Sequence, residues 1–244
     1  VIGSTNLLES VRLSDTVRSL IFITSDKCYE NIEKDSGYDE SSKLGGIDPY
    51  SASKASAELI YSSYCRSFYK NKKNFGSASV RAGNVIGGGD WSNDRIIPDC
   101  VRSIEKDEPI IIRNPNSTRP WQHVLEPISG YLLLAKEIFL DPNKYNGSWN
   151  FGPDENQNKT VLEVVKSFQD KIGKGSHEVK SDKDQLYESK LLQLNCDKAK
   201  KYLGWSPRWD FKKTIDATAE WYKFIMTNKN AEEITLTQIK EYFN

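Results

Sequence analysis

Residues 20–27 read LIFITSDK, and this stretch decides the fold class. The run LIFIT at 20–24 is apolar and rich in β-branched residues, which predicts a buried strand. Both faces of this strand carry apolar side chains, as in a central strand that helices cover on each side. Ser25, Asp26 and Lys27 follow at once, so the strand ends in a hydroxyl, a carboxylate and an ammonium group.

Further strands and helices alternate along the rest of the chain. Strands are expected at 77–82, 109–113 and 147–151. Helices are expected at about 2–14, 50–70, 95–106, 127–139, 160–172, 196–203 and 211–227, with a short final helix in the tail. This alternation indicates an α/β fold with a mostly parallel sheet. The strands become shorter after residue 85, which predicts a first domain at 1–85 and a smaller lobe at 86–244, some of whose segments return to the first domain.

The composition excludes several classes of protein. Apolar residues make up 37% of the 244, which supports a packed core and excludes a disordered chain. Thirty-four basic residues balance 34 acidic ones, so no bulk charge attracts nucleic acid or an anionic membrane. The cysteines form no CxxC pair and there are only two histidines, which predicts no metal site and reduced thiols in a cytoplasmic protein. No apolar stretch approaches the ~20 residues of a membrane span.

The segment DPYSASKASAEL at 48–59 contains a candidate catalytic pair. Asp48 suits a helix N-cap and Pro49 suits the first helical position. Tyr50 and Lys54 are four residues apart, so both project from one face of the helix. A neighbouring ammonium stabilises a phenolate and makes a tyrosine usable as a general base. The alternative is an ordinary amphipathic helix that carries these two residues by chance.

The end of the first strand is a second candidate site. Ligands of open α/β sheets bind outside the carboxyl ends of the strands, which is where Ser25, Asp26 and Lys27 lie. A hydroxyl can bond a substrate hydroxyl, and a carboxylic acid can protonate a leaving group. The alternative is a polar strand exit without a function.

Two later segments suggest a ligand-binding lobe. RAGNVIGGGDW at 81–91 has three consecutive glycines, where backbone can approach a ligand closely, although no G-x-G-x-x-G fingerprint occurs in the chain. In IIIRNPNSTRPWQHV at 110–124, two arginines are followed by two aromatic rings, which suits a diphosphate and a base. The alternatives are a flexible loop and solvated surface arginines.

Taken in order, these stretches resemble one family. TSDK, DPYSASK, RAGNVIGGGDW and TRPWQHVLEP are similar to the extended short-chain dehydrogenase/reductases, and within them to the nucleotide-sugar 4,6-dehydratases. GNVIGGGDW, TRPWQHVLEP and the later LNCDKAKKYLGWSPRW resemble the branch that acts on CDP-glucose. The resemblance implies a Rossmann-like doubly wound parallel sheet with a substrate-binding lobe, bound NAD, a homodimer, and a place in making bacterial surface polysaccharides such as O-antigen.

The resemblance also implies roles for individual residues. Tyr50 would take the proton from the sugar 4-hydroxyl as C4 is oxidised, and Lys54 would support Tyr50 and bind the nicotinamide ribose. Ser25 would bond the 4-oxygen, and Asp26 would protonate the departing 6-hydroxyl. Thr24, Tyr50 and Lys54 are the expected cofactor-binding residues. The expected substrate-binding residues are Asn84, Gly88, Arg95, Arg113, Arg119 (a diphosphate ligand), Trp121 and His123.

Lys27 departs from the pattern of most nucleotide-sugar dehydratases, which have glutamate there as the candidate base at C5. The enzymes of CDP-glucose resemble this chain in carrying lysine. An ordinary lysine is protonated at neutral pH and cannot be a base. We expect Lys27 to be either a base that its surroundings deprotonate or a cation that stabilises the enolate formed at C5.

The chain begins VIGSTNLLES, which has a helical stripe and no initiator methionine. The resemblance implies that the glycine-rich cofactor turn lies upstream, so we expect a fragment that binds NAD poorly, is inactive alone and exposes a sheet edge. One alternative function is a nucleotide-sugar 4-epimerase, which would use Tyr50 and Lys54 without an acid and a base after the strand. Another is a non-catalytic nucleotide-sugar-binding module.

Overall fold

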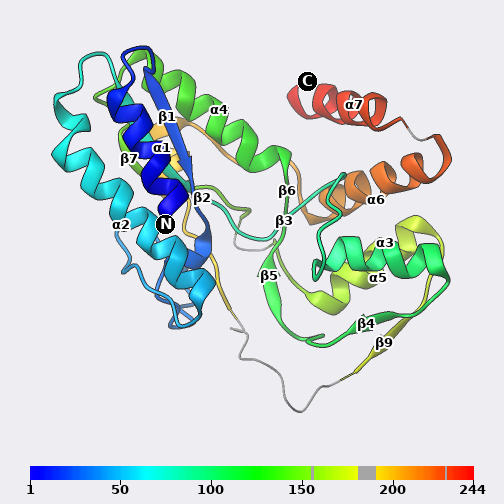
Figure 1. Ribbon diagram of the computed structural model, residues 1–244. Helices are drawn as coiled ribbons and strands as arrows, with labels where there is room; N and C mark the ends of the chain where they lie inside the picture. Colours follow the sequence, from blue (N-terminus) through cyan, green and yellow to red (C-terminus); the bar gives the residue numbers. More distant parts are fainter. Residues whose placement is uncertain (155–156, 181–190, 229) are drawn as a thin grey trace. The chain divides into compact units, whose positions relative to one another are not determined.

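The chain is organised as two compact units, each assembled from distant parts of the sequence (Figure 1). The computed structural model describes residues 1–154, 157–180, 191–228 and 230–244. Unit 1 comprises Val1–Gly83, Pro127–Gly152 and Leu192–Ser206. Unit 2 comprises Asn84–Glu126, Pro153–Leu191 and Pro207–Asn244.

Unit 1 is built on a three-stranded parallel sheet. Its strands are β1 (Ser19–Ile23), β2 (Gly76–Arg81) and β7 (Gly147–Asn150), in the order β1-β2-β7. Because the strands are parallel, their carboxyl ends lie at one edge of the sheet, where ligands of such folds bind. The expected α/β fold with a parallel sheet is confirmed.

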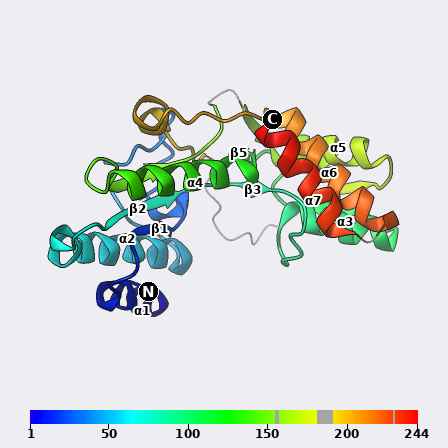
Figure 2. The same cartoon turned by 90° about the horizontal axis from the view of Figure 1, so that it is seen from above.

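Helices cover both faces of this sheet (Figure 2). On one side lie α1 (Ile2–Leu13) and α2 (Pro49–Ser67), and on the other lies α4 (Leu125–Leu140). Strand β2 alternates accordingly, since successive side chains point to opposite faces. Ala78 and Val80 join the core beneath α4, whereas Ser77 accepts a hydrogen bond from Tyr61 of α2 at 2.9 Å.

Strand β1 lies at the edge of the described sheet, which agrees with the expected exposed sheet edge, and a central place for it in a larger sheet stays a prediction. Among the described residues β1 pairs only with β2, and Ile23 at its end is 59% exposed. An apolar run indicates that other side chains cover the faces of a strand. In β1, for example, the ring of Phe22 stacks on that of Tyr61, with ring centroids 5.3 Å apart. Such a run does not indicate whether both edges are paired.

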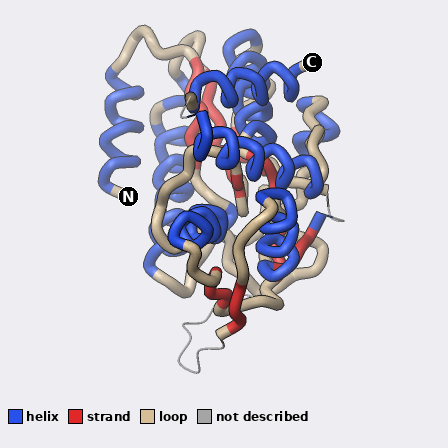
Figure 3. The backbone as a smooth tube through the Cα atoms, turned by 90° about the vertical axis from the view of Figure 1, so that its right-hand side faces the viewer, coloured by secondary structure: helices blue, strands red, loops and turns tan. Residues whose placement is uncertain are grey.

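Unit 2 has more helix than strand (Figure 3). Its helices are α3 (Ile96–Lys106), α5 (Val161–Ile172), α6 (Phe211–Asn228) and α7 (Ala231–Phe243). Its strands form three short pairs: β3 (Val85–Ile86) with β6 (Gln122–His123), β4 (Ile110–Ile112) with β9 (His177–Val179), and β5 (Thr118–Pro120) with β8 (Asn158–Thr160). The core includes Val101, Ile110, Val165, Phe168 and Tyr222.

A buried carboxylate in unit 2 fastens the C-terminal helix α7. Glu126 has no exposed surface and accepts hydrogen bonds from the backbone N–H of Arg208 at 3.0 Å and of Trp209 at 2.7 Å. The hydroxyl of Tyr242, on α7, donates to the same carboxylate at 2.7 Å. Burial raises the pKa of Glu126 above its ordinary value, against these hydrogen bonds and the nearby charge of Arg208, which lower it.

Short helical segments complete the fold. They are the 3₁₀ turns η1 (Asp26–Cys28) and η2 (Tyr69–Asn71) and the π-helix η4 (Ala199–Leu203), where an α-helix was expected at 196–203. In the part of the chain that the structure describes, no helix is long and apolar enough to cross a membrane. The same described part contains no group of three or more His, Cys, Asp or Glu side chains able to hold a metal ion.

Candidate active site

The first turn of α2 carries Tyr50 and Lys54. Asp48 caps the helix by accepting from the Ser51 backbone N–H at 3.0 Å, and Pro49 follows at the first helical position. Tyr50 is 52% exposed, and the Nζ atom of Lys54 lies 5.6 Å from the centre of its ring. The structure therefore brings the two side chains together on one helix face, as the spacing predicts.

At the end of β1, Ser25 and Asp26 form a buried hydrogen-bonded pair. The Ser25 hydroxyl donates to Oδ1 of Asp26 at 2.8 Å and accepts from the Lys27 backbone N–H at 3.2 Å. Ser25 is 8% exposed and Asp26 is 5% exposed. Ser25 thereby caps the turn η1 that contains Asp26 and Lys27.

Lys27 lies in the turn η1, which packs against α2. Hydrogen bonds from Ser51, with a smaller contribution from the positive charge of Lys27, hold the pKa of Asp48 below its ordinary value. The ammonium group is therefore close enough to act on the residue that caps the Tyr50 helix. Lys27 and the helix that carries Tyr50 and Lys54 thus lie in one region of unit 1.

The absence of a side chain at Gly83 leaves space for the Asp26 carboxylate. A Cβ atom at position 83 would lie 2.0 Å from Oδ2 of Asp26, which is an impossible contact. The Asp26 backbone N–H donates to the Ala82 carbonyl at 3.3 Å, so the turn lies directly against the end of β2. Only glycine at position 83 leaves the carboxylate where it is.

Beneath these side chains lies a buried ion pair that the sequence did not reveal. Arg81, the last residue of β2, donates from Nε and Nη2 to the two carboxylate oxygens of Glu58 on α2, at 2.9 and 2.8 Å. Both side chains are 2% exposed. The one available signal is that Glu58 continues the Tyr50 and Lys54 face of α2, one further turn along.

A cavity of about 450 Å³ lies beside the carboxyl end of β1. Thr24 and Lys54 both line it, as does the hydroxyl-bearing Ser53, with Phe22 and Ile23 as an apolar wall. The structure thus brings together two of the three residues expected at the cofactor, whereas Tyr50 lies outside this lining.

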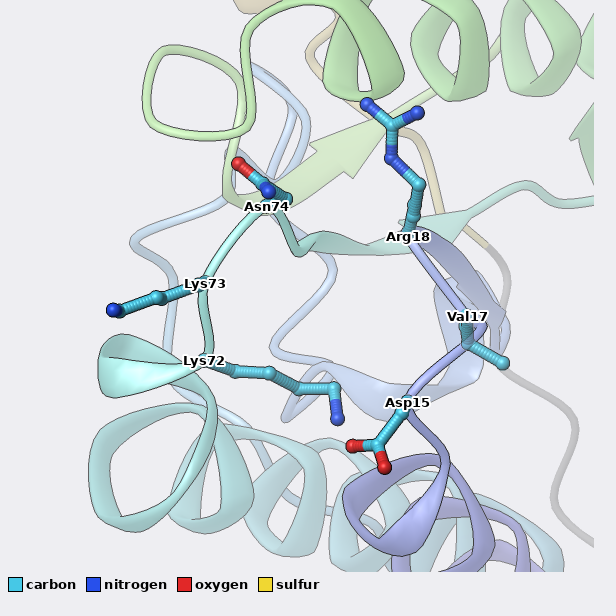
Figure 4. Close-up of a pocket in the computed structure, with 6 residues that line it drawn as sticks. All are labelled: Asp15, Val17, Arg18, Lys72, Lys73 and Asn74. Atoms are coloured by element: carbon cyan, nitrogen blue, oxygen red, sulfur yellow. The ribbon is translucent and has the colours of Figure 1, made fainter.

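A second cavity of about 510 Å³ lies at the opposite, amino end of β1 and β2 (Figure 4). Its lining includes Arg18, Lys72 and Lys73 and none of the predicted site residues. The ammonium of Lys72 donates to the Ser14 carbonyl at 2.5 Å, so part of this positive charge serves to hold the loop. The predicted chemistry therefore lies at the other end of the sheet.

In unit 2, the indole of Trp221 packs against the loop that contains the three consecutive glycines at 87–89. Asn84 has a left-handed backbone with φ of 52°, and its carbonyl accepts from the Gln122 backbone N–H at 3.2 Å. A Cβ atom at Gly88 would lie 2.0 Å from the indole of Trp221, so this glycine lets the loop close on the ring. Asn84 and Gly88 are thus held by unit 2 itself, and their contact with a substrate stays a prediction.

The three predicted arginines have different surroundings. Arg95 is exposed at the start of α3. Arg113 is exposed as well, with Nη2 3.6 Å from Oδ1 of Asp94. Arg119 is only 5% exposed on β5 and donates from Nη1 to the Thr118 carbonyl at 2.8 Å. A contact of any of these arginines with a diphosphate stays a prediction.

Trp121 and His123 are interior side chains of unit 2. The Trp121 indole donates to the Lys159 carbonyl at 3.0 Å, and His123 is 2% exposed with its ring 4.8 Å from that of Trp209. Burial, with a smaller contribution from Lys213, lowers the pKa of His123 to about 4, so the ring is neutral at physiological pH. A role for either ring at a ligand stays a prediction.

Comparison with known proteins gives a consistent set of relatives. Residues 1–218 match the profile of the family described as GDP-mannose 4,6 dehydratase. The chain is 42% identical to the CDP-glucose 4,6-dehydratase of Salmonella typhimurium over 249 aligned positions, which cover all of this chain and 69% of that protein. It is 25% identical to the dTDP-D-glucose 4,6-dehydratase of Bos taurus, covering 94% of this chain and 62% of that protein.

Solved structures show the same fold. The dTDP-glucose 4,6-dehydratase of Bacillus anthracis in complex with NAD aligns with a TM-score of 0.75 and 23% identity, covering 96% of this chain and 70% of the other. The UDP-glucuronic acid 4-epimerase of Bacillus cereus, in complex with UDP-glucuronic acid and NAD, aligns with a TM-score of 0.77 and 19% identity, covering 92% and 67%. At these identities the likeness establishes the Rossmann-like fold.

Proposed function

Because the chain belongs to the GDP-mannose 4,6-dehydratase family, we propose that it is an NAD-dependent nucleotide-sugar 4,6-dehydratase that converts CDP-glucose to CDP-4-keto-6-deoxyglucose. The 42% identity to the Salmonella enzyme, along the whole chain, supports CDP-glucose as the substrate. One observation carries the chemistry. The turn η1, which contains Asp26 and is capped by Ser25, packs against α2, the helix that bears Tyr50 and Lys54.

The cavity beside β1 fits the nicotinamide end of the cofactor. The hydroxyls of Thr24 and Ser53 and the ammonium of Lys54 suit a ribose, and the apolar Phe22 and Ile23 suit a flat ring. NAD, when bound, supplies the hydride acceptor for the sugar C4 and the donor for C6. The chain's own residues must hold the sugar and move the protons.

Tyr50 and Ser25 act on the 4-hydroxyl of the sugar. Tyr50 is half exposed, so its phenolate oxygen can reach a substrate and accept the hydroxyl proton. The Lys54 ammonium, 5.6 Å from the ring centre, stabilises that phenolate. Ser25 hydrogen-bonds the same sugar oxygen and keeps it in line with Tyr50.

Asp26 and Lys27 act on the loss of water. Asp26 protonates the departing 6-hydroxyl, and the Ser25 hydroxyl on Oδ1 and the backbone around Gly83 fix the direction of its carboxyl group. Lys27 acts when the C5 proton is removed. It either accepts that proton as a base or stabilises the resulting enolate with its positive charge. A 4-epimerase needs neither group, which favours the dehydratase.

Unit 2 is proposed to hold the nucleotide diphosphate. Arg119 is the diphosphate ligand, with Arg95 and Arg113 at the more exposed part of the site and Asn84 and Gly88 at the sugar. The native protein is proposed to be a cytoplasmic homodimer that pairs through α1 and α2. The exposed apolar side chains of Leu59 and Phe68 at α2 support that pairing.

The test is a substrate panel on the native protein that carries this sequence. CDP-glucose, UDP-glucose, dTDP-glucose and GDP-mannose are each incubated with protein and NAD, and the products are identified by mass and NMR. We expect a 4-keto-6-deoxy product with an 18-dalton loss, formed fastest from CDP-glucose. A 4-epimer of unchanged mass would favour the epimerase, whose fold matches with a TM-score of 0.77. No product from any substrate would leave only a binding module.

A further inference from the structure

The buried ion pair of Glu58 and Arg81 joins three segments that carry the proposed chemistry. Glu58 lies on α2, one turn beyond Lys54 and two turns beyond Tyr50. Its carboxylate accepts from the hydroxyl of Thr24, the residue just before Ser25, and from Arg81 at the end of β2. One carboxylate therefore ties the Tyr50 helix to the ends of both β1 and β2.

Arg81 fixes the other end of the same turn. Its Nη1 donates to the hydroxyl of Tyr29 at 2.5 Å, and its guanidinium carbon lies 4.9 Å from the centre of that ring. Tyr29 follows directly after η1, and its own hydroxyl donates to Oδ1 of Asn150 on β7 at 2.9 Å. The segment 25–28 is thus held on both sides, through Thr24 before it and through Tyr29 after it.

Every polar contact of this network is directional. Arg81 uses Nε and Nη2 on the carboxylate, Nη1 on Tyr29, and Nη2 again on the Ser148 hydroxyl at 3.0 Å. Burying two charges gives little net stability, since apolar residues of similar volume often serve as well. A bidentate ion pair adds directional hydrogen bonds, which apolar side chains do not supply.

We propose that Glu58 and Arg81 are positioning residues for the dehydration. They hold Ser25 and Asp26 in register with Tyr50 and Lys54, acting through Thr24 and Tyr29. This inference rests on the proposed function, and it adds two residues that touch neither substrate nor cofactor. Burial alone would lower the pKa of Arg81, but the ion pair with Glu58 raises it, so the guanidinium stays charged at any working pH.

The test uses Glu58→Gln, Arg81→Met and the double variant in the native protein. Glu58→Gln leaves Arg81 as a buried unpaired charge, so the single variant loses thermal stability as well as activity. The double variant removes that charge and regains stability. If the pair only stabilises, kcat returns with the thermal midpoint. If the pair positions the catalytic residues, the double variant regains the thermal midpoint of the unmodified protein, but its kcat stays about 100-fold lower and its KM for CDP-glucose is unchanged.

Tyr29→Phe tests the inference where the charge variants fail to fold. It keeps the ring and removes only the hydroxyl that Arg81 and Asn150 share. We expect a folded protein with lower kcat and faster amide exchange over residues 25–29. A matched control is Tyr242→Phe, which removes a hydroxyl from the buried Glu126 in unit 2 and should lower the thermal midpoint without changing kcat.

The outcomes separate this inference from the proposed function. Unmodified protein that turns over no nucleotide sugar overturns the proposed function and the positioning role with it. Normal kcat in Tyr29→Phe and in the double variant, beside an active unmodified protein, overturns the positioning role alone. Unchanged amide exchange over 25–29 in Tyr29→Phe also overturns it, whatever the activity.

Discussion

Glu58 in unit 1 and Glu126 in unit 2 are both buried, at 2% and 0% exposure, but different kinds of hydrogen-bond donor contact their carboxylates. Glu58 faces a full positive charge on Arg81 and binds three segments around the proposed site. Glu126, at the start of α4, accepts from the backbone N–H groups of Arg208 and Trp209 and from a phenol on α7, and none of these segments carries a predicted catalytic residue. The difference teaches that depth of burial does not distinguish a positioning carboxylate from a structural one, whereas the connected segments do.

Two Tyr→Phe variants, one in each unit, should give the largest difference between a catalytic and a structural side chain. Tyr50→Phe in unit 1 removes the proposed general base, so we expect kcat to fall by about 10³-fold. The fold should persist because the side chain is 52% exposed. Tyr242→Phe in unit 2 removes a donor to Glu126 and should cost about 2 kcal/mol of unfolding free energy with kcat intact. Steady-state kinetics and urea unfolding measure both, and a stability loss in Tyr50→Phe without a loss of kcat would break the comparison.

A pair of Gly→Ala variants tests the space around Asp26. In Gly83→Ala the new methyl group would lie 2.0 Å from the Asp26 carboxylate and must displace it, so we expect kcat to fall by about 100-fold. In Gly76→Ala, at the opposite, amino end of β2, the methyl group would lie 2.7 Å from Cγ2 of Ile138. That variant should lose about 1–3 kcal/mol of stability and keep its kcat. Equal kinetic effects in the two variants would contradict the assignment of Asp26.

Lys27 can be tested by isotope exchange at C5 of the sugar. With Lys27→Ala and Lys27→Glu, we expect slower incorporation of solvent deuterium at C5 during turnover in heavy water, because either proposed role of the lysine concerns that proton. Lys27→Glu should recover more exchange than Lys27→Ala if the group is a base, and less if it is a cation beside the enolate. Turnover by the alanine variant at the unmodified rate would sink both roles.

The pH dependence of stability tests the interior of unit 2. The folded-state pKa of His123 is lowered to about 4, from an ordinary value of 6.5. Its contribution to stability is therefore complete above pH 6.5 and is lost as the pH falls toward 4. Between pH 6.5 and 5 we expect the unfolding free energy to drop by about 2 kcal/mol from this group. His123→Gln should flatten that part of the profile, and an equally steep profile in the variant would show that another group is responsible.

The sequence predicted the larger elements well and the smaller ones poorly. Strands β1, β2 and β7 and helices α1–α6 lie close to their predicted ranges because apolar periodicity and caps such as Asp48 mark them. The two- and three-residue strands of unit 2 are too short to show a period. The exposed edge of the sheet was expected only from the family resemblance, because apolar faces say nothing about whether the edges of a strand are paired.

The candidate site shows the same division. Tyr50, Lys54, Ser25 and Asp26 could be proposed from the sequence because each lies in a local motif. Glu58 and Arg81 are 23 positions apart, and only the packing of α2 on β2 brings them together. The burial of Trp121 could not be read from its neighbours in the chain, since it depends on β8 supplying the Lys159 carbonyl.

The most direct test of the central claim follows a deuterium label through the reaction. CDP-glucose deuterated at C4 is turned over by the native protein that carries this sequence, and the product is examined by NMR. The dehydratase predicts a 4-keto-6-deoxy sugar with the label at C6, since the hydrogen removed from C4 is returned there. A sugar that keeps its 6-hydroxyl, with the label still at C4, would contradict it.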